Sequence, residues 1–177
     1  RELYRDLITL AFTQHGLAQR CFAADDLNEV SPAHQLHAAS FRAEKKLQLL
    51  IVCINQANQR TDLYALIGVI GARMELAQLP LAYFGASTGA AAALVAAARR
   101  PGLVRCVVSR GGRPDLAGES LATVNAPTLL IVGGADEVVL RLNKEACGRL
   151  TTVSRLEVIP GATHLFEESG ALEQVAE

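Results

Sequence analysis

Short apolar blocks alternate with helix-forming stretches through the second half of the chain. Such blocks, bounded by glycine, proline or polar residues, are typical of buried strands, and alanine-rich or amphipathic stretches are typical of helices. Strands that alternate with helices predict an α/β protein with a mainly parallel sheet flanked by helices. The predicted strands are one beginning at Leu81, Leu103–Ser109, Thr128–Gly134 and Ser154–Ile159, and the predicted helices are Ala90–Ala98, Val138–Leu150 and one opening near Glu167.

The first part of the chain carries weaker signals. Arg1–Gly16 has a helical stripe of apolar residues, and Leu17–Ala24 is a short strand by composition. Ala33–Gln48 can be helical, and Thr61–Gln78 is a further amphipathic helix. Leu47–Ile54 is almost entirely apolar, and periodicity alone leaves a strand and a buried helix both open there.

Length and composition exclude several classes of function. The 177 residues are enough for one domain with a real core, half of them are apolar, and the net charge is −1. We therefore expect neither nucleic acid nor a membrane as a partner, since there is no basic patch and the longest apolar run is too short to cross a bilayer. Because the chain begins at Arg1 and ends within a helix, we treat residues 1–177 as one domain that is a piece of a longer one.

The cysteines indicate a reducing compartment. They are widely separated and form no C-x-x-C pair, so we expect small buried hydrophobes in a cytoplasmic protein rather than disulfides or metal ligands. His34 and His37 are spaced to share a metal on a helix, but no third ligand is placed to join them, so we expect neither metal nor cofactor. The four cysteines are Cys21, Cys53, Cys106 and Cys147.

A G-x-S-x-G sequence joins the strand that begins at Leu81 to the alanine-rich helix. This arrangement predicts a nucleophile elbow, a sharp strand-to-helix turn that exposes Ser87 at its apex. Gly85 and Gly89 would be required because side chains there would collide with the neighbouring strand or helix. The alternative is a glycine-flanked turn that only packs tightly.

A serine hydroxyl needs a base, and the base needs an orienting carboxylate. Asp136 follows one predicted strand and His164 follows the last, so Ser87, Asp136 and His164 all fall at the carboxyl end of the parallel sheet. The order Ser, Asp, His is that of the α/β-hydrolase arrangement. Taken alone, an aspartate such as Asp136 is more often a turn or helix-cap residue, and His164 alone could be a surface loop histidine. Glu137 is a competing candidate for the acid.

Two arginines follow the strand next to the central one. Arg110 and Arg113 lie at the same end of the sheet as Ser87. Arg110 is a candidate substrate-binding residue that would favour an anionic substrate or fix its loop through an acidic neighbour. A solvated turn is the open alternative for both.

Four segments together resemble the dienelactone hydrolase-like branch of the α/β-hydrolases. The resemblance is close from Leu79 to the end and implies a three-layer fold, a mainly parallel sheet flanked by helices, incomplete at its N-terminus. It implies that Ser87 is the nucleophile, Asp136 the acid, His164 the base, and the backbone N–H of Thr88 one half of the oxyanion hole. The four segments are Tyr83–Ala92, Val107–Leu116, Ala126–Asp136 and Pro160–Phe166.

The chain also departs from this branch. True dienelactone hydrolases use a cysteine nucleophile, so Ser87 indicates a more general esterase. The loop after the family's third strand supplies the second oxyanion donor, and no matching His-Gly loop is present. Leu47–Ile54 is our hypothesis for that strand, which must lie beside the central one to avoid a gap in the sheet. Loss of one oxyanion donor typically lowers kcat by about 10²–10³.

The sequence thus predicts a serine hydrolase acting on a small-molecule ester or lactone. The competing hypothesis is a non-catalytic module that serves an attached domain or a partner, since some members of this branch are fused to phosphoribosyltransferase domains and a fold alone does not fix a function. Self-association through exposed sheet edges is a further possibility.

Overall fold

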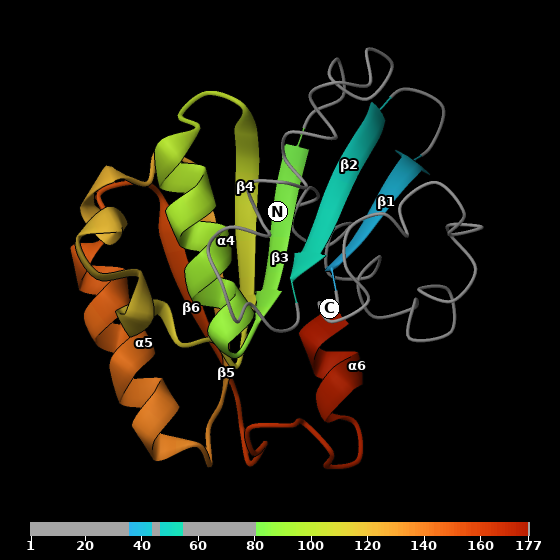
Figure 1. Ribbon diagram of the computed structural model, residues 1–177. Helices are drawn as coiled ribbons and strands as arrows, with labels where there is room; N and C mark the ends of the chain where they lie inside the picture. Colours follow the sequence, from blue (N-terminus) through green and yellow to red (C-terminus); the bar gives the residue numbers. More distant parts are fainter. Residues whose placement is uncertain (1–35, 44–46, 55–80, 177) are drawn as a thin grey trace.

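The structure, a computed structural model, describes residues 36–43, 47–54 and 81–176 (Figure 1). These residues form one mixed α/β unit in which strands and helices alternate after the central strand, which confirms the predicted fold class. The strands are β1 (Leu36–Ala43), β2 (Leu47–Ile54), β3 (Leu81–Ala86), β4 (Val104–Arg110), β5 (Thr128–Gly133) and β6 (Ser154–Ile159). The helices are α4 (Thr88–Arg99), the 3₁₀ helix η3 (Pro114–Thr123), α5 (Glu137–Arg149) and α6 (Ala171–Ala176).

The six strands form one sheet in the order β1-β2-β3-β4-β5-β6. The strands from β2 to β6 run parallel to one another, and β1 pairs with β2 in the antiparallel direction. Every residue of β3 is buried, as expected for a strand with a neighbour on each side and helices over the sheet. The carboxyl ends of β3, β4, β5 and β6 therefore meet at one edge of the sheet, where parallel α/β sheets place their sites.

The first part of the chain brings one confirmation and one correction. Leu47–Ile54 is a strand, and β2 pairs directly with β3 through partners such as Val52 and Tyr83, so the hypothesis that it fills the slot beside the central strand is confirmed. The expectation of helix over Ala33–Gln48 is wrong, because Leu36–Ala43 is strand β1. The backbone edge of β2 satisfies the hydrogen-bonding groups of β1, and such long-range pairing outweighs the weak helical preference of alanine.

Three predicted segments, Arg1–Gly16, Leu17–Ala24 and Thr61–Gln78, lie outside the described residues. In the second half the predicted elements agree with the observed ones to within a residue or two, apart from the last helix, which begins at Ala171. The 3₁₀ helix η3 was not predicted. It is kinked at Gly118, where φ is 56°, and such short irregular helices leave little periodic signal.

One core lies between the sheet and the helices α4, η3 and α5, which cover the same face. Successive side chains of a strand point to opposite faces, so alternate residues of β3 contribute to this core. It is built from alanines of α4 and larger aliphatic side chains around them. Its largest fully buried members include Tyr83, Leu94, Leu121, Val107 and Leu130.

A second, smaller core covers the opposite face of the sheet. It packs the other residues of β3 and β4 against α6 and the loop that precedes it. The members include Phe84, Val108, Ile131, Phe166 and Val175.

Two cysteines lie in the part of the chain whose side chains are described, and both are free. Cys106 of β4 is fully buried, and burial raises the pKa of Cys106 to about 12, so it behaves as the small core hydrophobe that was predicted. Cys147 of α5 is half-buried and lies 3.3 Å from the hydroxyl of Ser154. None of the described helices is long and apolar enough to cross a membrane.

Candidate active site

Ser87 lies at the turn between β3 and α4, and its backbone adopts a conformation that is rare for residues other than glycine. Its φ is 50° and its ψ is −123°, and such backbone strain persists only where neighbouring contacts hold it. The Ser87 N–H donates to the carbonyl of Arg110 at 3.3 Å, and the Ser87 carbonyl accepts from Ala90 at 3.2 Å and from Arg113 at 2.9 Å. This is the geometry of a nucleophile elbow, with the predicted serine at its apex.

Gly85 permits the close approach of helix and strand that the elbow needs. A Cβ atom at this position would lie 2.5 Å from the Ala90 Cα and 2.6 Å from the Gly89 carbonyl oxygen. Real side chains do not tolerate such contacts with backbone atoms, so only glycine fits. The reason that the sequence analysis assigned to Gly85 therefore agrees with the geometry.

Asp136 and His164 are hydrogen-bonded to each other, with 2.8 Å between Asp136 Oδ2 and His164 Nδ1. The other carboxylate oxygen of Asp136 accepts the N–H of Val139 at 3.3 Å and so caps helix α5. A carboxylate at Nδ1 keeps the proton of the neutral imidazole on that nitrogen and leaves Nε2 as the acceptor. The two alternatives for Asp136, helix cap and histidine partner, are thus both realised by separate oxygens.

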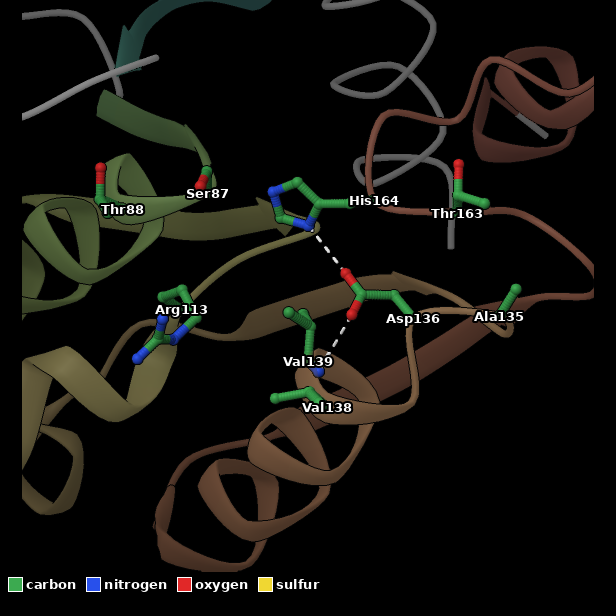
Figure 2. A pocket seen from close by; sticks show the side chains of 9 residues that line it. All are labelled: Ser87, Thr88, Arg113, Ala135, Asp136, Val138, Val139, Thr163 and His164. Carbon is green, nitrogen blue, oxygen red and sulfur yellow. Dashed lines mark hydrogen bonds and ion pairs between the residues drawn. The ribbon is translucent and has the colours of Figure 1, made fainter.

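Ser87, Asp136 and His164 line one pocket, with a cavity volume of about 530 Å³. Figure 2 shows the His164 ring between the other two residues, with the ring nitrogen that Asp136 does not contact on the side facing Ser87. Glu137, the competing acid, is exposed at the start of α5 and does not line this pocket. The structure therefore brings together the three residues that the sequence analysis selected.

Thr88 is the first residue of α4 and also lines the pocket. The first N–H groups of a helix lack partners within the helix and lie at the positive end of its dipole. Within the described part of the chain the Thr88 N–H has no hydrogen-bond acceptor. It is therefore available to an oxygen that gains negative charge above Ser87. The chain that follows β2, where the resemblance led us to expect the second oxyanion donor, is outside the described residues.

The two arginines take different positions. Arg113 lines the pocket, and its guanidinium donates to both oxygens of Asp115, at 2.9 and 2.8 Å. Arg110, the predicted substrate-binding residue, is not among the lining residues, and its guanidinium carbon lies 5.6 Å from the centre of the Phe166 ring. Burial lowers the pKa of Arg110 from its ordinary value.

The apolar wall of the pocket was not predicted from the sequence. Val138 and Val139 contribute to it from the first turn of α5, directly after Asp136. Two valines directly after a candidate acid could have indicated such a wall, because the first turn of the helix that follows the acid lies next to the site. Among the described residues, no three histidine, cysteine, aspartate or glutamate side chains are grouped to hold a metal ion.

Known proteins with similar structures carry hydrolase folds. A dienelactone hydrolase from Anabaena variabilis is 53% identical, has a TM-score of 0.63, and matches 66% of this chain and 54% of its own. An alpha-beta serine hydrolase homologue from Coxiella burnetii is 17% identical, has a TM-score of 0.61, and matches 82% of this chain and 90% of its own. The fold is that of an α/β-hydrolase. The chain resembles the dienelactone hydrolase-like branch, as the sequence motifs indicated.

A curated relative of this chain is named for a different activity. A protein of Mycobacterium tuberculosis, named as a candidate phosphoribosyl transferase, is 63% identical to this chain over 109 residues. Those residues are 62% of this chain and 25% of the relative. The chain thus spans about a quarter of that relative and about half of the solved dienelactone hydrolase. No protein-family model matches the chain.

Proposed function

We propose that this chain is the catalytic part of a serine hydrolase that cleaves carboxylic esters or lactones. The observation that carries the proposal is the 2.8 Å hydrogen bond between Asp136 and His164 in the pocket that Ser87 also lines. The hydrolases among the similar structures, including a dienelactone hydrolase and an esterase domain from Rhodothermus marinus, support the reaction class.

The proposed reaction proceeds in two stages. Ser87 Oγ attacks the ester carbonyl carbon while His164 Nε2 takes the hydroxyl proton, and Asp136 stabilises the resulting imidazolium. The carbonyl oxygen becomes an oxyanion beside the Thr88 N–H. His164 then gives its proton to the departing alkoxide, which leaves an acyl-enzyme on Ser87. A water molecule, deprotonated by the same imidazole, attacks the acyl carbon. His164 then returns that proton to Ser87 Oγ as the carboxylic acid leaves, which restores the serine. No cofactor is required.

The substrate class follows from the walls of the pocket. Val138 and Val139 offer an apolar surface to the acyl or alcohol group, and Thr88 and Thr163 add small polar groups. Because the nucleophile is serine, we propose general carboxylic esters rather than dienelactones. To test whether the substrate is anionic, we would compare the KM of the wild type, Arg110→Met and Arg113→Met for carboxylated and neutral esters. An unchanged KM for both esters in both variants rejects a role for these arginines in substrate binding.

The decisive test is covalent labelling with a fluorophosphonate, with the modified residue located by mass spectrometry. We expect Ser87 to be labelled selectively in the wild type, and labelling to be lost in Ser87→Ala and strongly slowed in His164→Ala. Circular dichroism must show that both variants fold. Absence of labelling in the folded wild-type chain, and in a chain extended at its N-terminus, rejects the proposal.

A second candidate function is a non-catalytic module attached to another domain. It is favoured by the Mycobacterium tuberculosis relative, which is named as a candidate phosphoribosyl transferase and is about four times as long as the part matched. Ester turnover that disappears in Ser87→Ala rejects this candidate. We also propose that the chain self-associates through exposed sheet edges. Sedimentation tests this, and a monomer at all concentrations rejects it.

A further inference from the structure

Asn143 is a fully buried polar residue in the middle of α5. Burying an amide is costly unless it is hydrogen-bonded, and asparagine is a poor helix former. The side-chain nitrogen of Asn143 donates to two carbonyl oxygens, that of Gly112 at 2.9 Å and that of Val139 at 2.8 Å. The first bond leaves the helix and joins α5 to the loop after β4.

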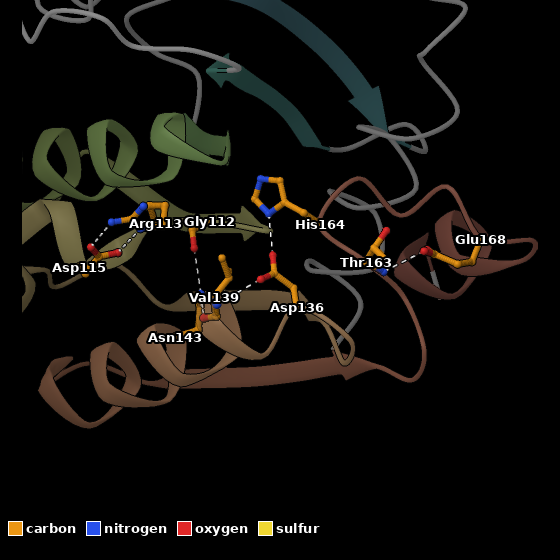
Figure 3. A network of polar contacts seen from close by, with 9 residues as sticks. All are labelled: Gly112, Arg113, Asp115, Asp136, Val139, Asn143, Thr163, His164 and Glu168. Carbon is orange, nitrogen blue, oxygen red and sulfur yellow. Dashed lines mark hydrogen bonds and ion pairs between the residues drawn. The ribbon is translucent and has the colours of Figure 1, made fainter.

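Both of these carbonyls belong to segments that hold the proposed catalytic residues. Gly112 precedes Arg113, whose N–H donates to the Ser87 carbonyl at 2.9 Å. The N–H of Val139 donates to Asp136, which in turn contacts His164. Figure 3 shows Asn143 between the loop that carries Gly112 and Arg113 and the start of the helix capped by Asp136.

The loop at Gly112, which accepts the hydrogen bond from Asn143, is also closely packed on the side away from α5. A Cβ atom at Gly112 would overlap the Ser109 hydroxyl and would lie 2.6 Å from the Ala90 Cβ. Gly111 is also held, because its N–H donates to the Ile131 carbonyl at 2.8 Å. The loop is thus packed against β4 and α4 on one side and hydrogen-bonded by Asn143 from α5.

We propose that Asn143 is a positioning residue that fixes Asp136 and His164 relative to Ser87. This inference rests on the proposed hydrolase function, because it concerns the alignment of the nucleophile with its base. Without the amide, the start of α5 and the loop at Gly112 adjust independently, and a displacement of about 1 Å between reacting groups can lower a rate by about 10²-fold. Binding to the pocket walls does not require that alignment.

The chain offers a matched control in Ser109. Its hydroxyl is fully buried beside the same glycine, but it has no hydrogen-bond partner among the described residues. Removing it therefore removes a buried polar group next to the loop without removing a bond to the loop. Asn143→Leu keeps the size of the side chain and removes both donated hydrogen bonds.

We expect Asn143→Leu to lower kcat and the rate of fluorophosphonate labelling by about 10- to 100-fold, with KM within about threefold of wild type. Ser109→Ala should leave all three unchanged. Asn143→Asp, which puts an acceptor against two carbonyls, should lose rate as Asn143→Leu does. All measurements are made below the unfolding temperature of the least stable variant.

A second readout does not depend on activity. Hydrogen exchange at the Arg113 amide reports its bond to the Ser87 carbonyl, and we expect Asn143→Leu to lower its protection more than that of amides in β5, with no such difference in Ser109→Ala. Equal labelling of wild type and Asn143→Leu overturns the inference and leaves the proposed function standing. If the wild type is not labelled, the proposed function fails, and unchanged Arg113 protection in Asn143→Leu then overturns the positioning role as well.

Discussion

The carboxylate of Asp136 has two partners, and each oxygen serves one of them. Oδ1 caps α5 through Val139, and Oδ2 contacts His164. Because Asp136 caps α5, its side chain is held at the sheet edge with little rotational freedom. A rigid helix thus fixes the position of the carboxylate that contacts His164. The two contributions can be separated, because asparagine caps a helix as well as aspartate does but does not orient an imidazole in the same way.

We predict that Asp136→Asn lowers kcat for an ester by about 10³–10⁴-fold while the free energy of unfolding changes by less than about 0.5 kcal/mol. Asp136→Ala should lose similar activity and about 1 kcal/mol of stability in addition, because it also removes the cap. Urea unfolding and ester hydrolysis measure the two effects. Near wild-type activity in folded Asp136→Asn would contradict the assignment of the acid.

The Arg113–Asp115 pair predicts a pH dependence at the pocket wall. Two hydrogen bonds from Arg113 hold the pKa of Asp115 below its ordinary value, and both side chains are partly exposed. A carboxyl whose pKa is lower in the folded state stabilises the protein above its unfolded pKa, near pH 4, and loses this contribution as the pH falls through the folded value.

We therefore predict that Asp115→Asn lowers the free energy of unfolding by about 0.2–1 kcal/mol at pH 7, a difference that shrinks below pH 4. Urea titrations at several pH values measure it. Glu145→Gln is the control, because it breaks a longer ion pair with Arg141 at 3.7 Å between more exposed side chains, and it should change less. A difference that grows as the pH falls would contradict the sign.

At the scale of elements, the elbow depends on how closely α4 approaches β3. Ser87 adopts the positive φ that the turn requires, and the absence of a side chain at Gly85 allows the strand to contact the backbone of Gly89 and Ala90. Helix α5 also contains a glycine, Gly148, but a Cβ atom there would meet nothing within 4 Å. The two glycines thus have opposite consequences when a methyl group is added.

We predict that Gly85→Ala lowers the free energy of unfolding by about 1–3 kcal/mol and abolishes labelling of Ser87, because the helix must shift away from the strand. Gly148→Ala should raise stability by up to about 0.5–1 kcal/mol and leave labelling unchanged, since alanine is a better helix former in open space. Thermal unfolding and labelling measure both. A Gly85→Ala protein as stable as the wild type would show that the contact can relax.

The sequence predicted helices and strands most accurately where the local composition of the segment favours the observed structure. The strand β5 coincides with an apolar block, and α4 with a run of alanines. The strand β1 was missed because its alanines favour a helix in isolation and only the partner β2 makes it a strand. The start of α6 was placed too early, since the turns that precede Ala171 carry no periodic pattern.

At the scale of the whole molecule, β3 lies between β2 and β4 and carries the elbow at its end. All of its residues are buried, so the loss of either neighbour would expose an apolar edge with unpaired backbone groups. The antiparallel strand β1 is different, because it pairs with β2 and not with the strand that leads into the site.

We predict that a chain beginning at Leu81 self-associates and loses its cooperative thermal transition, because the edge of β3 is then unpaired. A chain beginning at residue 44, which retains β2 and removes β1, is the control and should stay closer to the intact chain. Size-exclusion chromatography and circular dichroism compare them. A monomeric Leu81 chain with the same transition would show that β2 contributes little.

The sequence by itself determined the alternating α/β order and the three candidate residues, because Ser87, Asp136 and His164 each follow a local strand signal. It left open whether Asp136 caps a helix or faces a histidine, and only the fold shows that it does both. Tertiary structure also decided the place of Leu47–Ile54, the positions of Arg110 and Arg113, and the contacts of Asn143. These depend on residues distant in the chain, and backbone pairing, burial and side-chain hydrogen bonds across such distances leave no local pattern to read.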